Sequence, residues 1–268
     1  MVALGVVGSV NLDLVARVVR LPRPGETLTD ATFERIPGGK GANQAVAAQR
    51  LGASVTMAAA VGEDVFADEA LSGLRDAGVA LEVTRTGTTG VALILVGADG
   101  ENQIVVAPGA NATLTATLPR NVLCQLEIPV ETVQRAAAAA DRFFLNAAPA
   151  RELPAEVARR AEVVIVNRYE LDALPETPRL TALTLGAEGA VLLEEGREVA
   201  RAKPPRVDAV DGTAAGDAFT ACFVVSLLEE RPHEEALRRA CAAGAIAASR
   251  FGAQTSLPTK EEVDAILA

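Results

Sequence analysis

Two carboxylates separated by small residues, at positions 211–217, form the stretch of the sequence best suited to chemistry. Asp217 begins an apolar run, residues 218–225, which predicts a helix buried on all sides. Backbone N–H groups at such a helix start bind anions, and the helix dipole adds to the attraction. A carboxylate beside a bound phosphate could accept the proton of an attacking hydroxyl, as phosphoryl transfer requires. Asp217 could equally be a simple helix cap.

A glycine-rich stretch, residues 37–43, precedes a helix of small residues expected at 44–51. Its glycines allow the backbone to approach a ligand closely, and Lys40 and Asn43 can reach a ligand above the helix start. The spacing is not that of a Walker A loop, G-x-x-x-x-G-K-[ST]. A tight turn without a ligand would also explain these glycines.

Strands and helices alternate along most of the chain, which predicts the α/β class: a doubly wound, mostly parallel sheet in a single domain over residues 1–268. Strands are expected at residues 4–10, 55–61, 79–84, 121–126, 143–145, 163–166 and 180–185, with a hairpin at 190–194 and 198–202. The other helices are expected at residues 64–77, 132–140, 153–161, 234–249 and 260–267.

Polar residues follow several of these strands. Asn11 and Asp13 come after the first strand, Glu127 after the strand at 121–126, and Asn167 and Glu170 after the strand at 163–166, while Asp217 begins a helix. Each residue alone is more often a turn residue or a cap. Because open α/β sheets bind ligands beyond the carboxyl ends of their strands, the whole set predicts a site at one sheet edge.

A second, smaller sheet is expected from residues about 14–37 and 91–106. Residues 14–20 and 27–36 alternate in polarity but are too polar for the central sheet. Residues 91–96 and 103–106 predict a hairpin around the turn Asp99-Gly100. We expect this small sheet to cover the site.

Composition excludes several classes of function. The net charge of −10 argues against nucleic acid or an anionic membrane as a partner. Cys124, Cys222 and Cys241 are far apart, which argues against a disulfide framework or a zinc site, and the single His233 excludes histidine triads. With no basic leader and no long apolar stretch, a cytoplasmic protein is expected.

Four motifs, in order and over nearly the whole length, resemble those of the PfkB family of carbohydrate kinases. They are residues 8–13, residues 38–45, Asn167-Arg168-Tyr169-Glu170 (the N-x-x-E pattern) and residues 211–217 (usually D-T-x-[GA]-A-G-D). Residues 97–114 and 146–154 resemble the ribokinase branch of the family. The resemblance implies a ribokinase-like fold in which the small sheet is a lid that also pairs two subunits into a homodimer.

The resemblance also implies ATP-dependent phosphorylation of D-ribose at its 5-hydroxyl. Asp217 would be the base, and the backbone N–H groups of Ala214, Ala215 and Gly216 would hold the transferring phosphoryl group. The sugar would be bound by Asn11, Asp13, Gly38, Gly39, Lys40, Asn43, Glu127 and Asp217. Such polar groups reject sugars that lack a hydroxyl.

Three cofactors follow from the same resemblance: ATP, Mg²⁺ and a monovalent cation, K⁺. The nucleotide would meet Asn167, Glu170, Thr184, Leu185, Gly186, Ala187, Glu188, Gly189, Gly216 and Cys241, with Glu170 acting on Mg²⁺ and its waters. The K⁺ site would be formed by Asp211, Thr213, Ala247, Arg250, Gly252 and Ser256, mostly through backbone oxygens. A simple Asp211–Arg250 ion pair is the alternative there.

The sequence departs from the family in a few places. Gly212 replaces the usual Thr, position 214 is Ala rather than Gly, and the segments 114–121 and 174–184 are short. Deoxyribose, fructose, a keto-deoxy acid or a nucleoside are alternative substrates. A sugar or nucleotide sensor is the non-enzyme alternative, although it would not need Asp217 or Glu170. A Rossmann dinucleotide-binding protein is disfavoured because no G-x-G-x-x-G follows the first strand.

Overall fold

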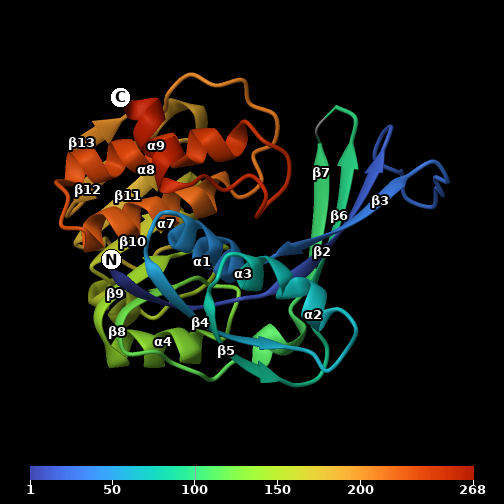
Figure 1. The fold of residues 1–268 in the computed structure, drawn as a ribbon, viewed down its shortest axis with the longest axis horizontal. Helices are drawn as coiled ribbons and strands as arrows, with labels where there is room; N and C mark the ends of the chain where they lie inside the picture. Colours follow the sequence, from blue (N-terminus) through green and yellow to red (C-terminus); the bar gives the residue numbers. More distant parts are fainter. Residues whose placement is uncertain (100) are drawn as a thin grey trace.

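The computed structural model describes residues 1–99 and 101–268 and contains two sheets (Figure 1). The large sheet has the strand order β13-β12-β11-β10-β9-β8-β1-β4-β5. Seven of its strands are parallel: β1 (Ala3–Val7), β4 (Ser54–Val61), β5 (Ala80–Arg85), β8 (Arg120–Cys124), β9 (Ala140–Asn146), β10 (Val163–Val166) and β11 (Leu180–Thr184). The hairpin of β12 (Ala190–Glu194) and β13 (Arg197–Ala202) adds two antiparallel strands. The predicted fold class is confirmed.

The strand order reverses at β1. From β1 the chain adds β4 and β5 on one side, and then returns to add β8, β9, β10 and β11 on the other. Ligands of open α/β sheets bind at such a reversal, beyond the carboxyl ends of the strands. The segments after β1, β8 and β9 therefore meet where a site is expected.

Helices cover both faces of the large sheet and form two apolar cores. One core lies under α1 (Lys40–Arg50), α3 (Ser72–Asp76), α7 (Ala215–Leu228), α8 (His233–Ala248) and α9 (Lys260–Leu267), and includes Val6 of β1. The other lies under α4 (Val130–Ala139) and α5 (Ala155–Arg160), and includes Val7. Because successive strand residues face opposite sides, β1 is apolar throughout. Helix α7 is buried from Asp217 to Leu228, as its uniformly apolar sequence predicts.

The small sheet projects from the body as a separate layer (Figure 1). Its order is β3-β2-β6-β7, formed by β3 (Thr32–Gly38), β2 (Asn11–Val18), β6 (Gly90–Gly97) and β7 (Asn102–Ala107). Both of its faces carry exposed apolar side chains, among them Phe33, Leu93 and Ile104. Among the described residues, no second layer covers this sheet's outer face.

Some predicted boundaries were wrong. Residues 27–31 are not in a strand, because pairing of β3 with β2 begins only at Thr32. The helix expected at 64–77 is two short helices, α2 (Ala67–Ala70) and α3, interrupted where the Ser72 hydroxyl bonds to the Glu69 carbonyl. Helix α1 begins four residues early, and the short helix α6 (Arg168–Asp172) was not predicted. Gly100, in the predicted hairpin turn, lies outside the described residues.

None of the helices in residues 1–99 and 101–268 is long and apolar enough to cross a membrane.

Candidate active site

The backbone of the turn after β1 packs closely against the backbone at the start of α1. A side chain at Gly41 would place its Cβ 2.5 Å from the backbone nitrogen of Ser9, so only glycine permits this approach. Gly39, at φ 92°, directs the chain into the helix. The Ser9 hydroxyl donates to Glu127 Oε2 at 2.5 Å, and the backbone N–H of Lys40 donates to the same oxygen at 3.0 Å. Glu127 thereby ties the end of β8 to the start of α1.

Two residues of β2 extend this cluster from the small sheet. Asn11 is buried, and its Oδ1 accepts a hydrogen bond of 2.8 Å from Asn111. Asp13 lies against Gly38, where a Cβ would come 2.3 Å from its carboxylate oxygen. Burial, together with repulsion by Glu127 and Asp217, raises the pKa of Asp13 to about 7.

Asp217 enters the cluster from the first turn of α7 and is only 5% exposed. Its Oδ2 accepts from Asn43 Nδ2 at 3.0 Å, and its Oδ1 accepts from Gln44 Nε2 at 2.9 Å. Burial raises the pKa of the Asp217 carboxyl, while Lys40 and the two amide donors oppose the rise. A carboxylate with a raised pKa is suited to accept a proton near neutral pH.

Lys40 is the one cation that the structure places among these acids. Burial disfavours the charge of its ammonium, but Asp217, Glu127 and Glu170 attract it and raise its pKa above the ordinary value. The carbonyl Oδ1 of Asn43 is buried and has no hydrogen-bond partner in the described chain. A polar atom in that position is expected to bind a ligand, since a buried unpaired acceptor is costly.

The turn before α7 is shaped to receive an anion. Ala214 lies in the left-handed region, at φ 60°, and the N–H of Ala215 donates to the Gly212 carbonyl at 3.2 Å. The N–H groups of Gly216 and Asp217, in the first helical turn, have no intrahelical acceptor. A Cβ at Gly216 would meet no atom within 4 Å, so protein packing does not require glycine there. The space beside Gly216 is therefore open for a ligand.

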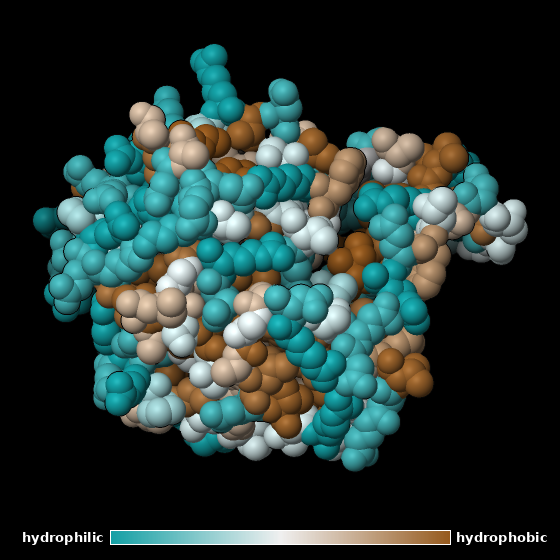
Figure 2. All heavy atoms as spheres, in the orientation of Figure 1, coloured by the Kyte–Doolittle hydropathy of each residue, from teal (hydrophilic) through white to brown (hydrophobic). Residues whose placement is uncertain are grey.

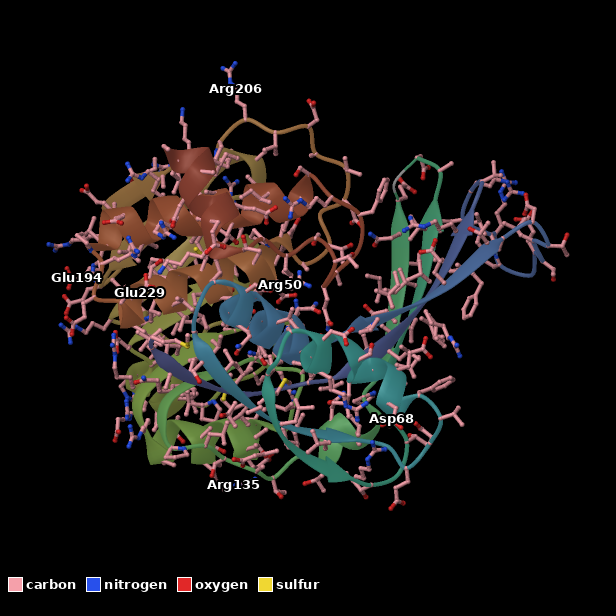
Figure 3. All side chains as sticks on the ribbon, viewed as in Figure 1. Arg50, Asp68, Arg135, Glu194, Arg206 and Glu229 are labelled. Carbon is pink, nitrogen blue, oxygen red and sulfur yellow. The ribbon has the colours of Figure 1, made fainter. Side chains whose placement is uncertain are left out.

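A cleft of about 840 Å³ adjoins this turn and gathers much of the predicted nucleotide set. It is lined by Thr184, Gly186, Ala187, Gly189, Gly216 and Cys241, together with the loop 204–209. Burial raises the pKa of the Cys241 thiol to about 12, so this side chain is a neutral surface of the cleft. Arg206, on the rim, points away from the body (Figure 3). Glu188 is exposed and pairs with Arg168 instead.

Asn167 and Glu170 form a capping box at the start of α6. Asn167 Oδ1 accepts from the Glu170 N–H at 2.9 Å, and Glu170 Oε2 accepts from the Asn167 N–H at 2.8 Å. These bonds leave Glu170 Oε1 available to a ligand. Burial raises the pKa of Glu170, and Lys40 opposes the rise, which places this carboxylate near the same charge cluster.

Two of the predicted cation-site residues, Thr213 and Gly252, bind the carboxylate of Asp211. Its Oδ1 accepts from the N–H and hydroxyl of Thr213, at 2.9 and 2.6 Å, and its Oδ2 accepts from the Gly252 N–H at 3.0 Å. Arg250 turns away and pairs with Glu262, so the Asp211–Arg250 pair is not formed. Arg50 of α1 (Figure 3) donates to the carbonyls of Gln254 and Leu257, which belong to the loop that follows Gly252.

A second cleft, of about 680 Å³, separates the small sheet from the body, and Figure 2 shows it as a notch. Asp13, Ile94 and Ile104 line its small-sheet wall, and residues 210–213 line the opposite wall. The cleft thus joins the polar cluster to the turn before α7.

Several buried residues of the site were missed by the sequence analysis. Gln44 contacts Gln125 and Asn146 as well as Asp217, and Ser9 and Asn111 hold the turn after β1. The available signal was a polar side chain inside an otherwise apolar stretch, as with Gln125 in the strand expected at 121–126.

Comparison with known proteins gives consistent matches over the full length. A model of the pfkB family carbohydrate kinases matches residues 3–260. A ribokinase of Bacillus subtilis is 38% identical over 290 residues, covering 98% of each protein, and a deoxyribokinase of Salmonella typhi is 32% identical over 304, also covering 98% of each. The structure of Arabidopsis thaliana ribokinase complexed with ribose and ATP matches with a TM-score of 0.87 at 29% identity, covering 100% of this chain and 99% of that one.

Gly41 and Gly216 occupy the same position, the second residue of a helix, and give a matched pair of substitutions. Gly41→Ala is expected to lower the free energy of unfolding by about 1–3 kcal/mol, because its Cβ overlaps backbone atoms.

Gly216→Ala is expected to leave stability unchanged but to lower phosphoryl-transfer turnover by about 10²-fold, because its methyl group would occupy the space proposed for the anion. Chemical denaturation and kcat measure the two effects; wild-type turnover in Gly216→Ala would contradict this reading.

Proposed function

The chain belongs to the pfkB family of carbohydrate kinases, and we propose that it transfers the γ-phosphoryl group of ATP to the 5-hydroxyl of D-ribose, giving ribose 5-phosphate and ADP. The observation that carries this proposal is the position of Asp217. Its buried carboxylate lies between the polar cluster next to the small sheet and the open turn at Gly216. A base beside an anion-binding turn is what phosphoryl transfer to a hydroxyl requires.

The polar cluster would bind and orient the sugar. Asp13 and Glu127 accept hydrogen bonds from hydroxyls, and the unpaired Oδ1 of Asn43 supplies a further acceptor. Asn11 offers the amide end that Asn111 leaves free. A sugar without one of these hydroxyls would leave a buried acceptor unpaired, which is the basis of selectivity.

The reaction would then need one proton transfer at this chain's own residues. As the sugar oxygen attacks the γ-phosphorus, its proton passes to Asp217 and the bond to the ADP oxygen breaks. The N–H groups at Gly216 and Asp217 would stabilise the charge that spreads over the phosphoryl oxygens. Lys40 would offset the negative charge between the two substrates.

The nucleotide would occupy the 840 Å³ cleft. Mg²⁺ would be held by the nucleotide phosphates, with Glu170 as the contributing side chain. Mg²⁺ usually keeps several waters and binds through one or two carboxylates together with substrate phosphates, so Glu170 alone would be a sufficient protein contribution. Bound there, Mg²⁺ would neutralise phosphate charge. Because ATP is a cytoplasmic metabolite, we propose the cytoplasm as the location.

Deoxyribose is the main alternative substrate, as suggested by the similarity to a deoxyribokinase, and assays over a panel of sugars would separate the two. A non-catalytic sensor is disfavoured by the burial of Asp217, since a binding protein gains nothing from a buried base with a raised pKa.

Asp217→Asn is expected to lower kcat for D-ribose by on the order of 10²-fold or more, because the amide cannot accept the proton. Ribose binding and thermal stability are expected to persist, since removing a buried charge relieves desolvation. Steady-state kinetics and calorimetric titration with ribose make the measurement. Asp141→Asn, at an exposed position at the start of β9, is the control. Near-normal kcat in Asp217→Asn would remove Asp217 from this role.

We also propose a K⁺ site beside Asp211. The last carbonyls of the 16-residue helix α8 face this segment, where Ala248 O accepts from the N–H groups of Val210 and Asp211. The last turn of α8 contains no basic residue, so the negative end of its dipole can attract a cation. Such an ion would act by fixing the turn at residues 212–216, since Thr213 belongs to both and Asp211 directly precedes the turn.

K⁺ is therefore expected to raise kcat or ATP affinity, while Li⁺, small and tightly hydrated, has little effect. Rates measured at constant ionic strength in K⁺, Li⁺ and a bulky organic cation test this expectation. Asp211→Asn is expected to weaken the dependence on K⁺. Equal rates in all three cations would refute the site.

The small sheet, we propose, is a lid that also pairs two subunits. On the face away from the cleft it exposes Phe33, Leu93 and Val105, with exposed fractions of 51–65%. An uncovered sheet face of this kind is expected to pack against another copy.

A homodimer is thus expected at micromolar concentration in sedimentation velocity. Leu93→Glu with Val105→Glu should give a folded monomer, because two charges would be buried in the interface. Val199→Glu, at a comparably exposed apolar residue of β13, should stay dimeric. A wild-type monomer, or a dimer unaffected by the double substitution, would count against the lid contact.

A further inference from the structure

Gln44 is the fully buried partner of the proposed base. Its exposed fraction is 0%, and it reaches three other side chains. Its Nε2 lies 2.9 Å from Asp217 Oδ1 and 2.9 Å from Asn146 Oδ1, and its Oε1 accepts from Gln125 Nε2 at 2.6 Å. Gln125 and Asn146 stand at the ends of β8 and β9, so Gln44 connects α7 to the centre of the large sheet.

The orientation of this amide is fixed by its partners. An ionised Asp217 carboxylate can only accept, and Asn146 presents its Oδ1 to Gln44, so the Nε2 end must face these two residues and Oε1 faces Gln125. Asn146 is itself held, because its Nδ2 donates to the Ile165 carbonyl at 3.1 Å and leaves Oδ1 facing Gln44. Rotating the Gln44 amide by 180° would break three hydrogen bonds at once. Gln44 therefore presents one N–H to Asp217 and the other to Asn146.

Asn43 cannot fix the base in the same way. It donates to the other carboxylate oxygen, Oδ2, but its own Oδ1 has no partner among the described residues and is left for the proposed sugar. Its position must adapt to the bound sugar, whereas Gln44 contacts only protein. We propose that Gln44 is a positioning residue for the proposed reaction: it holds Oδ1 of Asp217 so that Oδ2 faces the attacking hydroxyl.

The charges around Asp217 decide the sign of the pH effect. Lys40 of α1 lowers the pKa of Asp217, whereas Glu127 after β8 raises it, and Asp13 of β2 and Glu170 of α6 interact with it as like charges. The hydrogen bond from Gln44 favours the ionised carboxylate and lowers this pKa. Loss of that bond leaves the four charged neighbours in place and moves the pKa upward. Activity that requires the ionised base is then lost at a higher pH.

Gln44→Met keeps the length of the side chain and the helix propensity but removes its hydrogen bonds. We expect kcat at saturating ribose and ATP to fall by about 10- to 100-fold, in the range of a misplaced catalytic group. The acid limb of the kcat–pH profile should move to higher pH, while the KM values change by less than about threefold. Gln125→Met, which removes only the partner of Oε1, should give a smaller change in the same direction.

Gln49→Met is the matched control, because Gln49 lies on the same helix and its amide accepts only the Val55 N–H. It is expected to keep wild-type kcat and pH profile. A loss of thermal stability in Gln44→Met with unchanged kcat and an unshifted acid limb would reduce Gln44 to a structural role and overturn the proposal. If Gln44→Met does not fold, the same criteria apply to Gln125→Met. Absence of ribose phosphorylation by the wild type would instead contradict the proposed function.

Discussion

The hydrogen bonds from α1 to the buried carboxylate of Asp217 are the interaction on which the rest of this structure depends. An unpaired buried charge costs several kcal/mol, so α1 and α7 must pack closely enough for Asn43 and Gln44 to reach it. Both helices meet that requirement with small residues: α1 buries Gly41, Ala42, Ala45, Ala47 and Ala48, and α7 buries Ala218 and Ala221. The scarcity of aromatic residues, 3% of the chain, is consistent with this close packing.

The site concentrates negative charge before any substrate arrives. Glu127, Glu170 and Asp217 attract the ammonium of Lys40, and burial, with repulsion by Glu127 and Asp217, raises the pKa of Asp13 to about 7. Folding therefore favours the protonated form of Asp13. The contribution of this carboxyl group to the stability of the fold falls as the pH rises from the ordinary pKa of an Asp side chain toward 7. Hydroxyl groups of a sugar can donate hydrogen bonds to these carboxylate oxygens, so the substrate supplies interactions that the free protein lacks. The same unpaired acceptors that destabilise the free site therefore favour a ligand with many hydroxyl groups over one that lacks them.

The sequence analysis predicted the layers and the edge of the sheet better than it predicted contacts. Alternation of apolar segments was sufficient for the large sheet, since β4, β10 and β12 lie within one residue of their expected positions. The structure brings the glycine stretch to residues 211–217, where Asn43 donates to Asp217, a contact that only the family resemblance, and not the strand pattern, had implied. The amide network of Gln44, Gln125 and Asn146 could not be predicted, because it depends on the orientation of side chains that are 81 to 173 residues apart in the sequence. The capping box at Asn167 shows that a motif predicted to bind the nucleotide also caps a helix.

The pairing of the small sheet has a consequence for how the chain acquires its fold. Its central strands, β2 and β6, run parallel with Asn11 opposite Gly90, although the whole of α1, β4 and β5 lies between them. Parallel pairing across such a separation carries a large loop-closure entropy, which contacts in the intervening segment must offset first. The hydrogen bond from Asn43 to Asp217 spans 174 residues and cannot form until the last third of the chain is present. On the ribosome, the N-terminal half therefore emerges with its polar residues uncompensated, and the catalytic centre is completed only near the end of synthesis.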